Sequence, residues 1–94
     1  MKQQDFEIRH EALWQRMEGL LVALEQQRKT KRSQLPADIG AFPQDYRQIC
    51  HHLALARERQ YATYLIDRLD RLVVDGHRHL YRARSFFLSQ TLHF

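Results

Sequence analysis

Apolar residues recur every three or four positions along most of the chain, a pattern that predicts amphipathic helices. The first helix is predicted over residues 5–29. Its apolar stripe consists of Phe6, Leu13, Trp14, Met17, Leu20, Leu21 and Leu24. Acidic residues stand in its first turn and basic residues near its end, the distribution that the helix dipole favours.

A second helix is predicted over residues 43–59, after a connection over residues 30–41 that contains Pro36 and Gly40. Pro43 suits the first turn of this helix, where its missing N–H has no partner to lose. The apolar stripe consists of Tyr46, Ile49, Cys50, Leu53 and Ala54.

A third helix is predicted over residues 63–84, with Thr63 as its N-cap. The stripe consists of Leu65, Ile66, Leu69, Leu72, Val73, Gly76, Leu80 and Tyr81. Gly76 costs about 1 kcal/mol relative to alanine within a helix. We therefore expect it to permit the close approach of a bulky neighbour such as Trp14.

The predicted fold class is all-α, an antiparallel three-helix bundle over residues 1–84 with an apolar extension over residues 85–94. The extension contains no Lys, Arg, Asp or Glu. Ten helical residues span only about 15 Å, half of the hydrocarbon thickness of a bilayer. Two interpretations are open: a tail that folds back onto the core, or a membrane-proximal connector.

Length and composition narrow the class of protein. Ninety-four residues make one domain, too small for two independent cores. The single cysteine, Cys50, excludes an internal disulfide and fits a reducing compartment. Because it lies on the apolar stripe, we expect an inert thiol.

No motif for catalysis, metal binding or a cofactor is found in the sequence. The six histidines are His10, His51, His52, His77, His79 and His93. No two of them have the i,i+3 or i,i+4 spacing of metal ligands on a helix, so surface and boundary positions are expected. The three glycines are isolated and form no phosphate-binding loop. We predict no enzyme activity, no metal and no cofactor.

The net charge is +4 and the pI about 9.6, which permits contact with nucleic acids or anionic lipids. Aspartates interrupt the arginines of the third helix, so nucleic-acid binding is retained only as an alternative. Arg82 and Arg84 directly precede the uncharged segment that contains Phe86 and Phe87. Basic residues before an apolar segment are typical of the cytoplasmic side of a membrane span, so these four residues are predicted to be membrane-proximal.

Three segments carry a resemblance to a known family. They are the opening residues 1–10 with Trp14, the segment from Phe42 to Arg57, and residues 69–82. Together they resemble the N-terminal region of the stage II sporulation protein M-like membrane proteins. The resemblance implies a cytosolic helical region ahead of a multi-span membrane domain in bacteria. In spore formers, the family member joins a complex with peptidoglycan-remodelling partners. The spans themselves are absent from these 94 residues.

The sequence therefore predicts a non-enzymatic domain at the cytoplasmic face of a bacterial inner membrane, attached through a C-terminal region beyond this chain. It would act through contacts with a protein partner. The predicted contact residues are Tyr46, Arg47, Arg57, Tyr61 and Tyr81. The alternatives are a small nucleic-acid-binding protein and a homodimeric adaptor whose Phe-rich tail is buried across a twofold axis.

Overall fold

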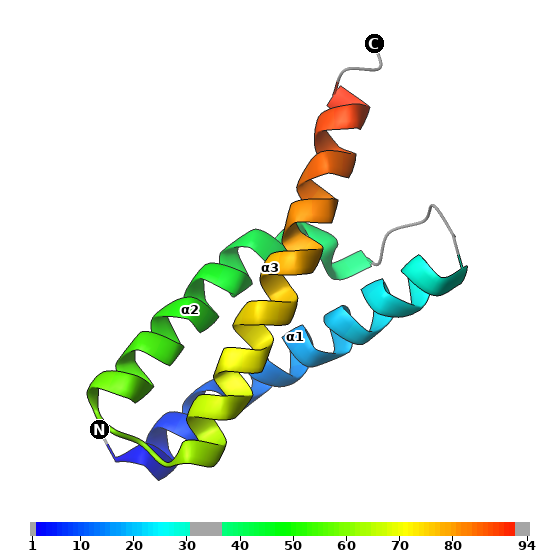
Figure 1. Ribbon diagram of the computed structural model, residues 1–94. Helices are drawn as coiled ribbons and strands as arrows, with labels where there is room; N and C mark the ends of the chain where they lie inside the picture. Colours follow the sequence, from blue (N-terminus) through cyan, green and yellow to red (C-terminus); the bar gives the residue numbers. More distant parts are fainter. Residues whose placement is uncertain (1, 31–36, 92–94) are drawn as a thin grey trace.

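The chain folds into three helices, as the sequence predicts (Figure 1). The computed structural model describes the backbone of residues 2–30 and 37–91, and the side chains of residues 2–30 and 39–81. The elements are α1 (Gln3–Thr30), a short 3-10 helix η1 (Ala37–Ala41), α2 (Phe42–Glu58) and α3 (Thr63–Thr91). No strand occurs in these described ranges, and the all-α class is confirmed.

The ends of α1 and α2 lie within two residues of their predicted positions, whereas α3 continues past Arg84 to Thr91. Figure 1 shows the C-terminal part of α3 (orange to red) projecting beyond the ends of the other two helices. The helices α2 and α3 pack along each other, and α1 diverges from α3 toward its own C-terminal end (Figure 1).

The turn between α2 and α3 follows the Schellman pattern of helix ends. Gln60 adopts a φ of 57°. The N–H of Gln60 donates to the Arg57 carbonyl at 3.1 Å, and the N–H of Tyr61 donates to the Ala56 carbonyl at 3.0 Å. These two bonds use carbonyl groups that the end of α2 leaves without helical partners. The left-handed residue reverses the chain, so that α3 returns along α2.

The start of α3 is held by Gln3 on α1 instead of by Thr63, so the predicted cap is wrong. The carbonyl of Ala62 accepts hydrogen bonds from the N–H groups of Leu65 and Ile66. The N–H of Ala62 itself donates to Gln3 Oε1 at 2.8 Å. The first turn of α1 is thereby fastened to the α2–α3 turn by a contact between residues 59 positions apart in the sequence.

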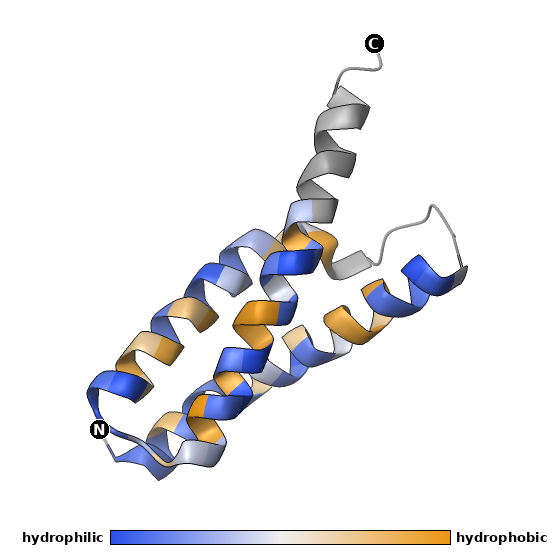
Figure 2. Cartoon of the chain, in the orientation of Figure 1, coloured by the Kyte–Doolittle hydropathy of each residue, from blue (hydrophilic) through white to orange (hydrophobic). Residues whose placement is uncertain are grey.

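The core contains the apolar stripe predicted for α1, and apolar and polar stretches alternate along the helices (Figure 2). The largest fully buried side chains are Phe6, Trp14, Met17, Phe42, Ile49, Leu65 and Leu69. On α2 the buried face differs from the predicted stripe: Ala54 is exposed, and Cys50 is only half-buried. Asp45 and His52 are buried in their place.

Gly76 permits the close approach of Tyr46, and not of Trp14 as the sequence suggested. A Cβ atom added at Gly76 would lie 2.9 Å from Cδ2 and 3.2 Å from Cε2 of the Tyr46 ring. Real Cβ atoms essentially never come within 3.0 Å of such atoms, so the ring would have to shift. At Gly19, an added Cβ would meet nothing within 4 Å.

These two glycines give a matched stability test. Alanine gains about 1 kcal/mol over glycine within a helix, so we expect Gly19→Ala to stabilise the protein by about 0.5–1 kcal/mol. At Gly76 the overpacking cost of about 1–3 kcal/mol outweighs that gain, and Gly76→Ala should destabilise by about 1 kcal/mol. Urea denaturation measures both free energies of unfolding. In a Tyr46→Ala background, Gly76→Ala should become stabilising; continued destabilisation there would contradict the proposed clash.

Candidate functional site

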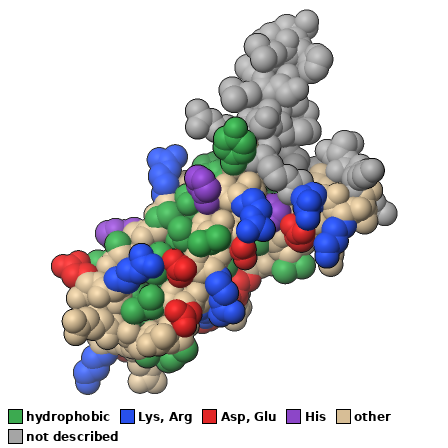
Figure 3. Space-filling view, viewed as in Figure 1, with side chains coloured by type: hydrophobic (Ala, Val, Ile, Leu, Met, Phe, Trp, Pro, Cys, Tyr) green, Lys and Arg blue, Asp and Glu red, His purple; other side chains and the backbone are tan. Residues whose placement is uncertain are grey.

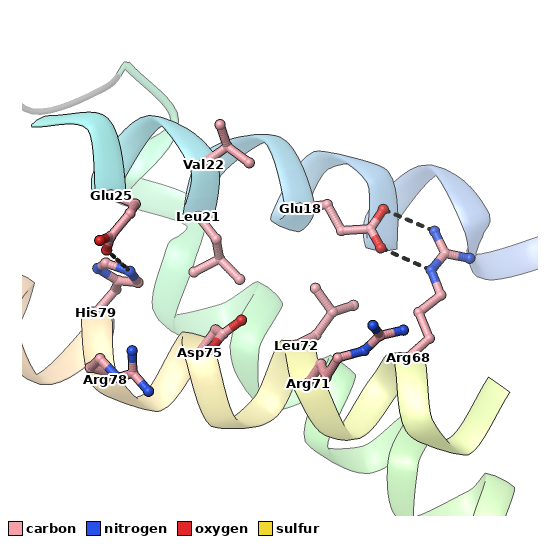
Figure 4. Close-up of a pocket in the computed structure, with 10 residues that line it drawn as sticks. All are labelled: Glu18, Leu21, Val22, Glu25, Arg68, Arg71, Leu72, Asp75, Arg78 and His79. Atoms are coloured by element: carbon pink, nitrogen blue, oxygen red, sulfur yellow. Dashed lines mark hydrogen bonds and ion pairs between the residues drawn. The ribbon is translucent and has the colours of Figure 1, made fainter. Parts of the chain in front are cut away.

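Two grooves flank α1, one facing α3 and one facing α2. The α1/α3 groove has a volume of about 470 Å³. Its walls are Glu18, Leu21, Val22 and Glu25 from α1, and Arg68, Arg71, Leu72, Asp75, Arg78 and His79 from α3. Figure 4 shows Glu18 and Glu25 of α1 directed toward Arg68 and His79 of α3, with Val22 pointing away from α3. Figure 3 shows basic and acidic side chains interspersed on this face. Positive and negative charges balance in this groove.

Arg68 anchors one end of the α1/α3 groove. Its guanidinium donates to Glu18 at 2.9 and 3.0 Å and to Glu11 at 2.6 and 2.8 Å. It also lies over the Trp14 ring, with Cζ 5.4 Å from the ring centroid. The hydrogen bonds that Arg68 donates to Glu11 and Glu18 raise the pKa of Arg68, and the same bonds to Glu11 lower the pKa of Glu11. Two bidentate pairs on one guanidinium link α3 to two positions on α1 that lie two turns apart.

Glu25 lies at the other end of the α1/α3 groove, between His79 and Arg28. Its carboxylate lies 3.4 Å from His79 Nε2 and 3.1 Å from Arg28. The hydrogen bond from Arg28 is the main reason that the pKa of Glu25 is lowered. His79 is buried, contrary to the surface position that the sequence suggested for the histidines. The paired charges at both ends make this groove a structural joint between α1 and α3.

The α1/α2 groove is lined largely by basic and polar side chains and has a volume of about 600 Å³. Its walls are Arg9, His10, Leu13 and Arg16 from α1, and Gln44, Arg47, Gln48, His51 and His52 from α2. Next to this wall lies Asp45, which is buried. Arg16 donates to both carboxylate oxygens of Asp45, at 3.0 and 3.1 Å. This bidentate pair fixes the register of α1 against α2.

An aromatic cluster closes the inner side of the α1/α2 groove. The Trp14 indole N–H donates to His52 Nδ1 at 2.9 Å, and both side chains are buried. The rings of His10 and His52 are 3.9 Å apart between centroids, and Phe6 packs edge-on to both histidines. Because Nδ1 of His52 accepts the indole hydrogen, the neutral ring carries its own proton on Nε2.

Both histidines of this cluster favour the neutral form. Burial, with smaller contributions from His10 and His51, lowers the pKa of His52 to about 4 from an ordinary 6.5. Burial and the nearby Arg9 lower the pKa of His10. A protonated His52 could no longer accept the Trp14 hydrogen at Nδ1. The sequence analysis expected the histidines at surface and boundary positions, whereas His52 is buried.

We therefore expect the protein to lose stability as the pH falls from 6.5 toward 4. In that window the unfolded chain binds a proton at residue 52 that the folded chain does not, so the free energy of unfolding decreases with decreasing pH. The contribution of His52 is complete above pH 6.5, and at most about 3 kcal/mol of it is lost by pH 4. Chemical denaturation at pH 7 and pH 4.5 measures the loss.

The matched variants for this test are His52→Gln and His51→Gln. Glutamine at position 52 keeps an acceptor for the Trp14 indole but does not titrate, so the dependence on pH should become shallower. The same substitution at the exposed His51 should leave the dependence as it is. Equal slopes in all three proteins would exclude His52 as the source.

The three tyrosines predicted as contacts occupy different environments. Tyr46 is half-buried against Gly76, and burial raises its pKa to about 12. Tyr61 packs on Phe6, with ring centroids 5.3 Å apart. Tyr81 is 74% exposed on α3. Only Tyr81 among them presents most of its surface to solvent.

The two predicted arginines also differ. Arg57 forms an exposed ion pair with Asp70 at 3.1 Å, whereas Arg47 is exposed on the wall of the α1/α2 groove. The predicted membrane-proximal residues lie on the continuation of α3, outside the residues whose side chains the structure describes; they are Arg82, Arg84, Phe86 and Phe87.

The sequence analysis missed the roles of Asp45, His52 and Arg68, each of which makes a polar contact between helices. A signal for the first two was present: Asp45, Ile49, His52 and Ala56 follow a spacing of three and four along α2. The prediction considered only apolar residues, and it therefore placed the buried face of α2 about one position away from this set. On α3, Arg68 likewise follows the helical spacing of the buried face, three residues after Leu65 and four before Leu72.

Within residues 2–30 and 39–81, whose side chains the structure describes, no group of three or more His, Cys, Asp or Glu side chains could hold a metal ion. Over the same ranges, no helix combines the length and the apolar character that crossing a bilayer requires.

Comparison with known proteins places the chain in a family. A sequence profile described as a domain of unknown function, DUF8413, matches residues 4–82. Searches of curated proteins and of solved structures gave no significant match. The profile covers all of α1 except its first residue, all of α2 and most of α3, so the family is defined by the whole bundle.

Proposed function

We propose that this chain, which belongs to the DUF8413 family, is a non-enzymatic interaction domain of a bacterial inner-membrane protein. In this proposal the bundle lies at the cytoplasmic face of the membrane and contacts a protein partner, as in a cell-envelope or sporulation-like complex. The resemblance to the stage II sporulation protein M-like proteins suggests the membrane context. The observation that carries the contact role is the exposed apolar surface on the outer side of α3.

Val74 and Tyr81 form this surface, which we name the α3 ridge. Their exposed fractions are 52% and 74%. Seven residues separate them, so they lie on the same face of the helix, two turns apart. Exposed tyrosine is enriched among the residues that dominate binding energy at protein interfaces. The ridge therefore offers an anchor that the bundle itself does not use.

The direction of α3 supports the membrane part of the proposal. The helix leaves the bundle and continues to Thr91 without a break (Figure 1). A helix that projects from the ridge end of the bundle would carry a following segment away from the core. Arg82 and Arg84 stand on this projecting part, directly before the Phe-rich sequence. In the proposal, these arginines lie at the level of the lipid headgroups.

Reading the gene beyond the codon for Phe94 tests the membrane context. We expect the reading frame to continue through several apolar segments of about 20 residues each, the length that a helix needs to span the hydrocarbon region. A stop codon directly after Phe94 would contradict membrane attachment and would leave the homodimeric adaptor and nucleic-acid-binding alternatives to be compared.

In-cell photo-crosslinking tests the contact role of the α3 ridge. A photo-reactive phenylalanine analogue replaces Tyr81 in the chromosomal gene, and irradiation should give one discrete adduct with a different protein in the membrane fraction. The control carries the analogue at Ile8, which is 71% exposed on α1 and should give no such adduct. Similar patterns from both positions would contradict a specific ridge contact. An adduct of two copies of this chain would favour the homodimeric alternative.

A further inference from the structure

The arginines of the bundle fall into two groups according to their partners. Arg16, Arg28, Arg57 and Arg68 each bind a carboxylate within 3.1 Å. By contrast, Arg9, Arg47, Arg71 and Arg78 form no hydrogen bond or ion pair with any residue that the structure describes. Arg9 and Arg47 are exposed and line the α1/α2 groove. Arg71 and Arg78 line the α1/α3 groove, where carboxylates balance the charge.

The two walls of this groove present hydrogen-bond donors to each other. Arg9 and Arg16 are seven residues apart and share one face of α1. The opposite wall follows the spacing of three and four along α2, with Gln44, Arg47, Gln48 and His51. Guanidinium and amide N–H groups therefore approach the same space from both helices.

The balance of charge distinguishes this groove from its neighbour. The α1/α3 groove has three arginines and three carboxylates on its walls. The α1/α2 groove has three arginines on its walls and no carboxylate, and the adjacent Asp45 is already bound by Arg16. Counting the three arginines and Asp45, the groove has a formal net charge of +2. An excess of positive charge in a concave surface attracts anions.

We propose that the α1/α2 groove is a binding site for a phosphate-bearing anion, such as a diphosphate group. The planar fork of arginine matches phosphate oxygens, and two arginines on opposite walls can bind one anion between them. The volume of about 600 Å³ suits a small ligand. This site goes beyond the proposed function, and it is independent of the α3 ridge and of any membrane span.

The surroundings of the groove favour a compact anion over a long polyanion. Asp5 lies one turn before Arg9 on α1, and Glu58 lies two turns after His51 on α2; both belong to exposed residues. A nucleic acid that extended beyond this end of the groove would meet these two carboxylates. A single phosphate or diphosphate group would bind between the arginines and reach neither.

Titration of the 94-residue chain with inorganic pyrophosphate at about 0.15 M salt and pH 7 tests the site, because long-range attraction by net charge is largely screened under these conditions. We expect saturable binding of one anion per chain, measured by calorimetry, with NMR shifts concentrated at Arg9, Arg47 and His51. Removing one charge-assisted contact commonly costs a factor of about 10–100 in affinity. Arg9→Ala and Arg47→Ala should therefore each weaken binding by about tenfold or more. Both residues lack partners in the described structure, so the variants should fold, as circular dichroism can verify.

The matched control is Arg71→Ala, which removes the same charge from an exposed residue of the balanced α1/α3 groove. It should change the affinity by less than about twofold, since a contribution through net charge alone is largely screened by salt. Equal weakening by Arg71→Ala and Arg47→Ala would overturn the proposal, because attraction would then be non-specific. The absence of saturable pyrophosphate binding, together with retention of a single-stranded oligonucleotide, would overturn it as well.

Binding to phosphatidylglycerol vesicles distinguishes a lipid headgroup from a soluble phosphorylated compound as the ligand. Co-sedimentation that is lost in Arg9→Ala and Arg47→Ala but kept in Arg71→Ala identifies a lipid headgroup as the ligand. Pyrophosphate binding without such vesicle binding identifies a soluble phosphorylated compound. If the protein binds neither pyrophosphate nor the vesicles, the proposed anion site is contradicted. That result would not bear on the proposed contact at the α3 ridge, so the two proposals can be contradicted independently.

Discussion

Trp14 is the side chain through which the three helices are held together. It is fully buried on α1, donates its indole N–H to His52 on α2, and lies under the guanidinium of Arg68 from α3. The ring supplies buried apolar surface. Its indole N–H binds His52, and its π-face binds the guanidinium of Arg68. A leucine could fill part of this space but could select neither partner. Trp14 therefore specifies which face each neighbouring helix presents, in addition to supplying buried surface.

The polar contacts around Trp14 define the register of the bundle. Arg16 holds Asp45 one half-turn along α1 from the tryptophan, and Arg68 holds Glu11 and Glu18 on either side of it. An apolar stripe alone would tolerate a helix sliding by one turn, because leucines are interchangeable as neighbours. A bidentate pair has one geometry, and a slip would leave Asp45 buried without its cation. The ion pairs thus contribute specificity more than stability.

The same contacts divide the surface into regions of different character. On the α3 side, Glu18 and Glu25 of α1 contact Arg68 and His79, and the groove as a whole has equal numbers of arginines and carboxylates. On the α2 side, one arginine is neutralised and two are left over, so positive charge accumulates in a concave surface. The outer side of α3 exposes Val74 and Tyr81, beyond the Asp70 that pairs with Arg57. Packing of the core therefore leaves two separate surfaces, one basic and one apolar, that the bundle does not need for its own stability.

The sequence alone determined that this chain is helical, with the ends of α1 and α2 close to those observed, because a period of 3.6 residues and the positions of proline are local properties. It also identified the buried stripe of α1 and the special role of Gly76. The tertiary structure decided the rest: that Tyr46 is the neighbour of Gly76, that Gln3 caps α3, and that His52 is buried as the acceptor of Trp14. Each of these depends on how the helices are rotated about their axes, which no single segment encodes. The sequence of a single segment does not distinguish a buried aspartate from an exposed one. Burial of the charged carboxylate is tolerated only where a partner from a distant helix offsets the free-energy cost of desolvation.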